Sequence, residues 1–135
     1  MAFITWEDEF SVGVEAFDND HRELIKYINN LHAGIISGRP SGAMKSTLKD
    51  LENYIAKHFK REQDLMEKHS YPDSAKHNIA HSSFTEKVNE FTQRLESGEI
   101  FFSLEMMSFL KNWLINHILK IDMAYKEFFQ EKDER

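Results

Sequence analysis

The sequence predicts an all-α protein, an up-down-up-down antiparallel four-helix bundle with an extended N-terminal arm. Along four long segments the apolar residues recur at alternating steps of four and three, which is typical of amphipathic helices that face a core. The 135 residues include only 5 Gly and 2 Pro, too few turn residues for a many-stranded β protein. Short connections favour antiparallel neighbours, and we expect residues 1–135 to form a single domain.

The arm and the first two helices are placed by residues that cap or interrupt the apolar pattern. Residues 1–17 are expected to form the arm, whose apolar side chains pack on the bundle. Asp18 is a candidate N-cap for the first helix, over about residues 19–37. Ser41 is a candidate N-cap for the second helix, over about residues 42–68.

The third and fourth helices are bounded in the same way. Asp73 follows Pro72 and is expected to begin the third helix, over about residues 74–96. The fourth helix is expected over about residues 103–129. Its start is the least defined boundary, because residues 100–102 can form either helix or packed loop.

Composition argues against several classes of function. Lys and Arg number 17 and Asp and Glu number 23, a net charge of −6, so nucleic acid and anionic membrane are not expected partners. Because there is no Cys, disulfides, thiolate catalysis and Cys-based metal sites are excluded. No apolar run approaches the roughly 20 residues that cross a bilayer, and the acidic N-terminus is unlike a secretion signal. We therefore expect a cytoplasmic monomer.

Polar residues interrupt the apolar stripes of all four predicted helices. In antiparallel helices they all fall near the same end of the bundle. A buried imidazole or carboxylate without partners costs several kcal/mol, and metal coordination would satisfy all of these groups at once. The interrupting residues are His21 on the first helix, His58 and Glu62 on the second, His77 and His81 on the third, and His117 and Asp122 on the fourth.

The number of these groups indicates two metal ions. Five neutral imidazoles and two carboxylates are too many ligands for one ion. If both carboxylates bridge two ions, the ions have five and four protein donors. A further oxygen bridge raises the numbers to six and five and leaves one position open. Mixed nitrogen and oxygen ligation with expanded coordination suits iron better than tetrahedral zinc.

These motifs resemble the hemerythrin family, and within it the free-standing bacterial members. The resemblance covers nearly the whole chain, and all seven ligand positions are filled in order. A single H-x-x-x-H pair would be a weak signal, whereas the combination is specific. The motifs are the run Asp18-Asn19-Asp20-His21, the H-x-x-x-E of His58 and Glu62, the H-x-x-x-H of His77 and His81, and the H-x-x-x-x-D of His117 and Asp122.

The resemblance implies the role of each residue. Two iron ions would be bridged by Glu62, Asp122 and an oxo or hydroxo group. One iron would be six-coordinate, and dioxygen would bind the other at its vacant position. The six-coordinate iron would take His77, His81 and His117, and the other iron His21 and His58. An apolar oxygen pocket, which excludes water and protons, would be lined by Phe59, Trp113, Leu114 and Ile118.

Two features depart from a simple match. The residue before the first ligand is commonly Gln in the family and is Asp20 here. We do not expect Asp20 to bind metal, but it can alter the charge near the site and with it the autoxidation rate. His117 and Asp122 are five residues apart, about 140° around an ideal α-helix, so both reach the metals only by a long lateral reach or a local π-bulge.

Other polar residues are expected to have structural roles. His32 is expected to be a hydrogen-bonded or boundary histidine, and His69 a surface or C-cap residue. Tyr125 is expected to pack in the core with a wet hydroxyl, in preference to donating a hydrogen bond near the metals. Residues 130–135 are expected to be a solvated, charged end.

The function that the resemblance implies is reversible dioxygen binding for transport, storage or delivery, without enzymatic activity. An oxygen- or redox-sensing module acting on a partner domain is the alternative, although a chain that starts at Met1 and ends soon after the fourth helix favours a free-standing carrier. A diiron oxidase is less favoured, because no His has Glu three residues before it, as ferritin-like sites require. A zinc peptidase is excluded because Asn78 stands where H-E-x-x-H has its Glu.

Overall fold

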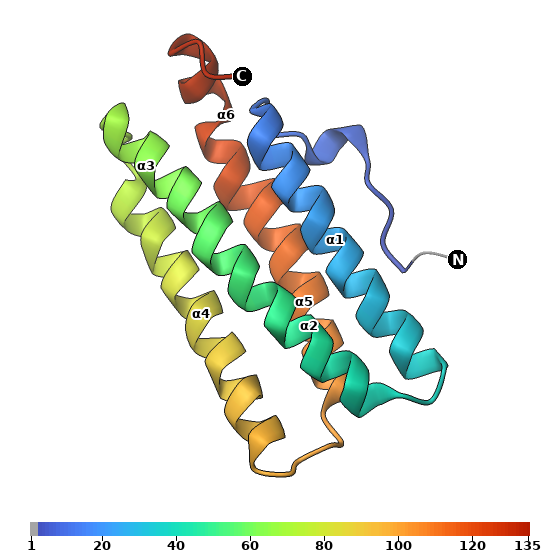
Figure 1. The fold of residues 1–135 in the computed structure, drawn as a ribbon. Coiled ribbons are helices and arrows are strands. Elements are labelled where there is room, and N and C mark those ends of the chain that lie inside the picture. The colour runs from blue at the N-terminus through green and yellow to red at the C-terminus, as the bar shows by residue number, and fades with distance from the viewer. Residues whose placement is uncertain (1–2) are drawn as a thin grey trace.

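The computed structural model confirms the antiparallel four-helix bundle (Figure 1). It describes residues 3–135, apart from the side chain of residue 119. Two of the four helical rods are single helices, and each of the other two contains a short π-helical segment. The elements are α1 (Glu15–Ile36), α2 (Pro40–Tyr54) continued by the π segment η2 (Ile55–Phe59) and α3 (Lys60–Lys68), α4 (Ser74–Glu96), and α5 (Ser103–Asn116) continued by the π segment η3 (His117–Asp122) and α6 (Met123–Glu131).

The N-terminal arm is shorter than expected, because α1 begins at Glu15 and not near residue 19. Val14 occupies the N-cap position, so the interpretation of Asp18 as the cap was wrong. Asp18 lies in the first helical turn, where one carboxylate oxygen accepts from the Val12 amide at 2.8 Å and the other from the Ser11 hydroxyl at 2.6 Å. The carboxylate therefore ties the end of the arm to the helix.

The rest of the arm packs along α1. It includes a 3₁₀ turn, η1 (Asp8–Phe10). The side-chain amide of Asn29 accepts from the Ile4 amide and donates to its carbonyl, both at 2.8 Å. The first two residues of the expected arm lie outside the described residues.

Two further boundaries differ from expectation. The second rod begins at Pro40, with Arg39 and not Ser41 at the N-cap position. Proline favours the first helical position because its missing N–H would have no partner there. The fourth rod ends at Glu131, slightly beyond the expected residue 129. Asp73 occupies the N-cap position of α4 but makes no side-chain hydrogen bond to it.

The π segments are the main departure from regular α-helix. The segment η3 (His117–Asp122) confirms the local π-bulge that the five-residue spacing of these two residues allowed. Its wider turn brings residues five apart onto nearly the same face. The segment η2 (Ile55–Phe59) was not expected, since the i, i+4 spacing of His58 and Glu62 already suits an α-helix.

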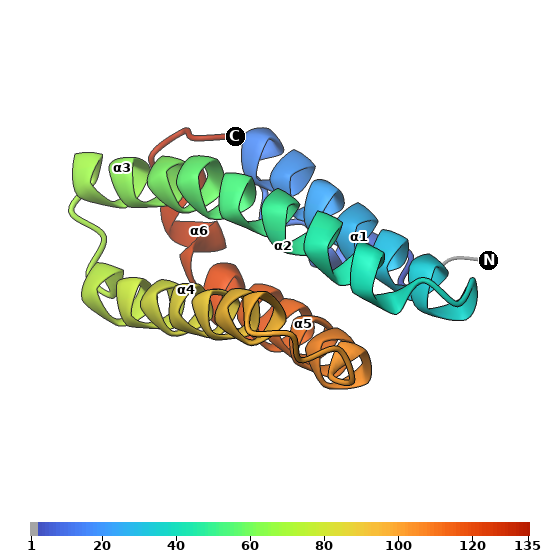
Figure 2. The same ribbon diagram turned by 60° about the horizontal axis from the view of Figure 1, so that its bottom comes forward.

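The helices form two layers, with α1, α2 and α3 in one and α4 and α5 in the other (Figure 2). Aromatic rings fill the end of the bundle away from the histidines, where Phe91 packs on Phe102 and Phe109 with ring centroids 5.7 and 5.8 Å apart. Gly34 lets α1 approach α2, because a Cβ there would overlap the side chain of Ala43. Within residues 3–135, no helix has the length and apolar character needed to cross a membrane.

Candidate metal centre

Seven polar side chains from all four rods meet inside the bundle, each with at most 2% of its surface exposed. Their ligand atoms form two overlapping groups, and within each group all the atoms lie within 4.8 Å of one another. These are the seven residues that the sequence indicates as metal ligands. One group contains Glu62, His77, His81 and His117, and the other contains His21, His58, Glu62 and Asp122.

The carboxylate of Asp122 lies between the two groups. One oxygen, Oδ1, is 3.0 Å from Nε2 of His77 and 2.8 Å from Nε2 of His117. The other oxygen, Oδ2, is 3.0 Å from Nε2 of His21. The two oxygens therefore face opposite groups, which is the arrangement a bridging carboxylate needs. The π segment η3 makes it possible, because it carries both His117 and Asp122.

Glu62 also reaches both groups. Its Oε1 atom is 2.8 Å from Nε2 of His58 and 3.1 Å from Nε2 of His81. Its Oε2 atom is 3.5 Å from Nε2 of His77. Glu62 extends from α3, whereas Asp122 lies at the end of η3 on a different rod. Carboxylates from two rods thus lie between the histidines.

Despite these short distances, the cluster is almost free of internal hydrogen bonds. The Nε2 atoms of all five histidines have no hydrogen-bond partner among the described residues, nor do Oε1 of Glu62 and both oxygens of Asp122. Buried polar atoms without partners are rare and costly. Nitrogen and oxygen lone pairs that converge without donors between them suit cations. The residues present therefore fit a metal site with mixed nitrogen and oxygen ligands.

The charges in the cluster are strongly coupled. Burial by itself lowers the pKa of His58, but the carboxylates of Glu62 and Asp20 outweigh burial and raise it to about 10. Burial likewise lowers the pKa of His77, but the nearby carboxylates of Asp122 and Glu62 outweigh burial and raise it to about 9. Without metal, protons on these rings would balance the carboxylates. Metal ions must displace those protons when they bind.

Asp20 contacts a candidate ligand from outside the cluster. Its Oδ2 atom lies 2.8 Å from Nδ1 of His58, and its Oδ1 atom accepts a hydrogen bond from Arg61 at 2.6 Å. A carboxylate on the outer nitrogen fixes the orientation of an imidazole and increases its basicity. The sequence indicated that Asp20 can change the charge near the site. It did not indicate these contacts, because they join residues about forty positions apart.

Tyr125 also contacts the cluster, and the expectation that its hydroxyl would be wet was wrong. The side chain is fully buried, and its hydroxyl donates a 2.6 Å hydrogen bond to Oε2 of Glu62. The ring also stacks on His77 with centroids 5.5 Å apart. Because the side chain is buried, its hydroxyl has Glu62 as its partner in place of solvent.

The four residues expected to line an oxygen pocket surround the histidines with apolar groups. Phe59 stacks on His81 with ring centroids 3.7 Å apart, and Trp113 stacks on His117 at 4.1 Å. Leu114 and Ile118 are buried to 1% exposure on either side of His117 along the chain. Trp113 is half-buried and also lines a surface pocket of about 340 Å³ between α4 and α5.

Comparisons with known proteins agree with this geometry. Residues 12–129 match the family described as "Hemerythrin HHE cation binding domain". The chain belongs to the hemerythrin family. Bacteriohemerythrin of Stenotrophomonas maltophilia is 34% identical over 127 residues, 94% of this chain and 82% of that protein. Bacteriohemerythrin of Methylococcus capsulatus is 32% identical over 126 residues, 93% of this chain and 95% of that protein. A crystal structure of wild-type hemerythrin is 31% identical with a TM-score of 0.84, covering 93% of this chain and 97% of that chain.

The remaining two histidines of this hemerythrin lie away from the cluster. His32 stacks on Phe3, with ring centroids 4.6 Å apart. His69 occupies the C-cap position of α3, as expected, and its Nε2 atom lies 2.9 Å from a carboxylate oxygen of Glu134. Glu134 also accepts from Lys68 at 3.0 Å. The C-terminal end is therefore attached to α3 and is not simply solvated.

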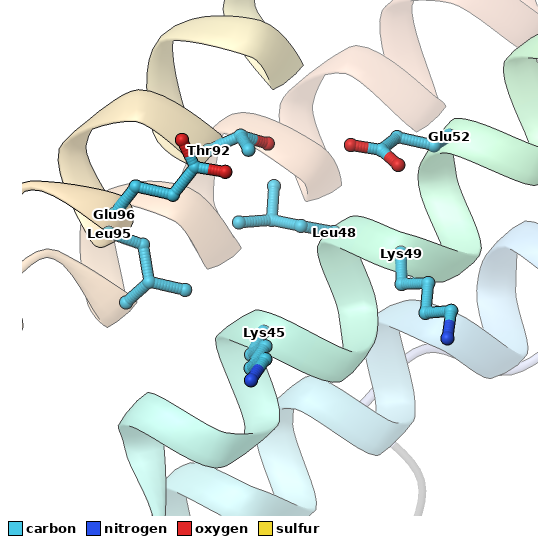
Figure 3. Close-up of a pocket in the computed structure, with 7 residues that line it drawn as sticks. All are labelled: Lys45, Leu48, Lys49, Glu52, Thr92, Leu95 and Glu96. Atoms are coloured by element: carbon cyan, nitrogen blue, oxygen red, sulfur yellow. The ribbon is translucent and has the colours of Figure 1, made fainter.

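A pocket of about 430 Å³ between α2 and α4 lies away from the metal site of this hemerythrin (Figure 3). Thr92 follows His81 by 11 residues on α4, a separation of about 16 Å along the axis. The Thr92 hydroxyl is already bonded to the Val88 carbonyl, and the ammonium groups of Lys45 and Lys49 point away from the carboxylates of Glu52 and Glu96 (Figure 3). The lining of the pocket is Lys45, Leu48, Lys49, Glu52, Thr92, Leu95 and Glu96.

Proposed function

We propose that the protein binds dioxygen reversibly at a non-heme diiron centre, for oxygen transport, storage or delivery. The observation that carries the proposal is the pair of overlapping ligand groups, both of which contain Glu62. Five imidazoles and two carboxylates exceed the needs of one ion, and mixed nitrogen and oxygen ligation suits iron. Membership of the hemerythrin family supports both iron and dioxygen.

Each side chain has a separate task in this proposal. Glu62 and Asp122 would hold both irons, with an oxo or hydroxo group as a further ligand. When bound, the iron pair would supply electrons to dioxygen and recover them when oxygen is released. The imidazoles divide into two sets, in line with the two ligand groups: His77, His81 and His117 would hold one iron, and His21 and His58 would hold the other, at which dioxygen would bind.

The apolar side chains around the cluster protect the bound oxygen. Phe59, Leu114 and Ile118 are all buried and carry no hydrogen-bond donor or acceptor in their side chains. They exclude water that would bring protons to the site or occupy the open position. Trp113 covers the imidazole of His117 on one face. Exclusion of protons favours release of dioxygen unchanged over its loss as peroxide.

Asp20 is a positioning residue in this scheme. It holds Nδ1 of His58, so that Nε2 points into the cluster toward Glu62. Such an outer carboxylate strengthens the imidazole as a metal ligand. The second hydrogen bond of Asp20, from Arg61, keeps the carboxylate in place. The positive charge of Arg61 also moderates the negative charge of Asp20.

Repeated oxygenation tests the proposal directly. The iron-loaded, reduced protein is exposed to oxygen, the visible spectrum is recorded, and oxygen is removed under argon over several cycles. A carrier should form a stable visible band that disappears on deoxygenation and returns at the same amplitude. Continued oxygen consumption without a persistent band would show an oxidase and contradict the proposal.

The physiological setting is also part of the proposal. A carrier should keep the same backbone structure with and without oxygen, so limited proteolysis should give the same fragments in both states. A sensing module would instead show a change in the fragments. The cytoplasmic location and the monomeric state expected from the sequence stay predictions.

A further inference from the structure

The two carboxylates of the cluster differ in their surroundings. Both oxygens of Asp122 are without a hydrogen-bond partner among the described residues. Glu62, in contrast, accepts a 2.6 Å hydrogen bond from the buried hydroxyl of Tyr125. This is a link from a distant part of the chain, since the two residues are 63 positions apart. Only one of the two candidate bridges is therefore held by an outside donor.

The hydrogen bond leaves the metal-facing side of the carboxylate available. A carboxylate oxygen has two lone pairs, so Oε2 of Glu62 can accept from Tyr125 with one and face a cation with the other. The other oxygen, Oε1, points toward His58 and His81 and has no donor. Tyr125 therefore fixes the rotation of the carboxylate without occupying the side that bridges.

The donor is also held in place. The side chain of Tyr125 is fully buried. The ring is held by its stacking on His77 and by contact with Phe129, whose centroid is 4.9 Å away.

We propose that Tyr125 is a positioning and redox-tuning residue, which holds Glu62 in its bridging orientation and draws electron density from it toward the phenol proton. The inference rests on the proposed diiron function. A hydrogen bond to a ligand oxygen weakens that oxygen as an electron donor, and a weaker donor set favours the lower oxidation state of a metal. Tyr125 therefore stabilises the reduced, oxygen-binding form of the site.

Replacement by phenylalanine isolates the hydroxyl from the ring. Tyr125→Phe keeps the packing on His77 and Phe129 and removes only the donor. Tyr71→Phe is a matched control, because Tyr71 is also buried and packs 6.3 Å from the Tyr125 ring. Loss of a partner that orients a ligand commonly weakens metal binding about 10- to 100-fold, so Tyr125→Phe should bind cobalt(II) at least roughly tenfold more weakly than the parent.

Two measurements decide the proposal. The first is cobalt(II) titration of the metal-free proteins, followed by absorption. The second is the reduction potential of the iron-loaded proteins, which should become more negative in Tyr125→Phe and stay at the parent value in Tyr71→Phe. Parent-like cobalt affinity and potential in Tyr125→Phe would overturn the proposal. The cobalt titration does not involve oxygen, so the two proposals can fail separately. If the parent does not bind oxygen, the proposed function is wrong, and the cobalt affinities of the parent and Tyr125→Phe still decide whether Tyr125 positions Glu62.

The parent protein provides a test that does not depend on the folding of a variant. In the diamagnetic, zinc-loaded protein, the Tyr125 hydroxyl should give a slowly exchanging, downfield-shifted proton signal with a contact to the Glu62 side chain. A Tyr125 hydroxyl proton that exchanges with solvent as fast as a surface tyrosine would refute the hydrogen bond and the proposal with it.

Discussion

The carboxylate of Asp20 lies 2.8 Å from Nδ1 of His58, so this histidine is oriented by an acid from outside the cluster. The Nδ1 atoms of His21, His81 and His117 have no partner among the described residues. The outer support is therefore unequal. It falls on His58, one of the two histidines that in our proposal hold the iron with the open position, and not on the other, His21.

Replacing Asp20 should weaken that iron site selectively. Asp20→Asn keeps the size of the side chain and removes its charge, so His58 becomes a poorer ligand and Arg61 loses its ionic partner. We expect the affinity for one of two metal ions to fall about tenfold or more, measured by metal titration of the metal-free protein. Asp64→Asn, on the exposed face of α3, is the control and should match the parent. Equal affinities in the two variants would show that Asp20 does not support the site.

Loss of Glu62 should remove a bridge between the metals. Glu62→Ala leaves two cations with less negative charge between them, so at least one ion should be lost. Because metal binding contributes folding free energy, the melting temperature of the iron-loaded protein should also fall. Metal analysis and calorimetry measure both effects, with Glu67→Ala on the exposed face of the same helix as control. Full iron loading with unchanged melting in Glu62→Ala would contradict the bridging role.

A polar group in the oxygen pocket should change the chemistry more than the fold. Ile118 is buried and follows His117 in η3, so Ile118→Glu places a carboxylate beside the open position. We expect faster autoxidation, or a filled position and no oxygen binding, in a protein that still holds two irons. Ile79→Glu makes the same change at a site that is 68% exposed and should behave like the parent. An oxygen adduct as long-lived as the parent's in Ile118→Glu would place the pocket elsewhere.

The metal-free protein should lose stability as the pH rises above neutral. The folded-state pKa values of about 10 for His58 and about 9 for His77 lie above the ordinary value, about 6.5. Protonation of these two histidines therefore favours the folded state fully below about pH 6.5, and this contribution is lost as the pH rises through about 9 and 10. Differential scanning calorimetry should show a falling melting temperature between pH 7 and pH 10.

At low pH the carboxylates of the cluster have the opposite effect, and the metal-free protein should lose stability as the pH falls. Burial alone would raise the pKa of Glu62 and of Asp122, but the neighbouring histidines lower both. These two carboxylates stabilise the folded state at pH values above the ordinary carboxyl pKa. That stabilisation is lost as the pH falls through the lowered pKa values of the folded protein. The metal-free protein should therefore be most stable in weakly acidic solution. A melting temperature that rises from pH 7 to pH 10 would contradict the charge coupling in the cluster.

Some features of this site were predictable because they follow from spacing along one helix. The five-residue step from His117 to Asp122 does not fit one face of an α-helix, and this misfit predicted either a long lateral reach or a local π-bulge, of which the structure contains the second. The segment at residues 55–59 gave no such signal, because His58 and Glu62 are correctly spaced for an ordinary helix. Asp18 accepts from a backbone amide, as a cap would, but the amide belongs to Val12 in the arm. Sequence periodicity does not show whether Asp18 accepts from an amide of its own helix or from an amide of the arm.

Other features depend on contacts between distant segments, which no local pattern encodes. The bonds from Asp20 to His58 and from Tyr125 to Glu62 join residues on different rods. Periodicity places Tyr125 on the core face of its helix, and that position suits packing as well as hydrogen bonding. The partner of its hydroxyl is determined by how deeply the neighbouring rods bury it. Such outer contacts become visible only when the rods are assembled.

The central claim is that one chain holds two bridged irons, and metal analysis combined with spectroscopy tests it most directly. Protein produced with ample iron is assayed for iron and zinc per chain, and its spectrum is recorded in the reduced state before and after oxygen. We predict two irons per chain and a visible band that forms with oxygen and is lost on its removal. One zinc per chain, or a single iron with no oxygen-dependent band, would contradict the account.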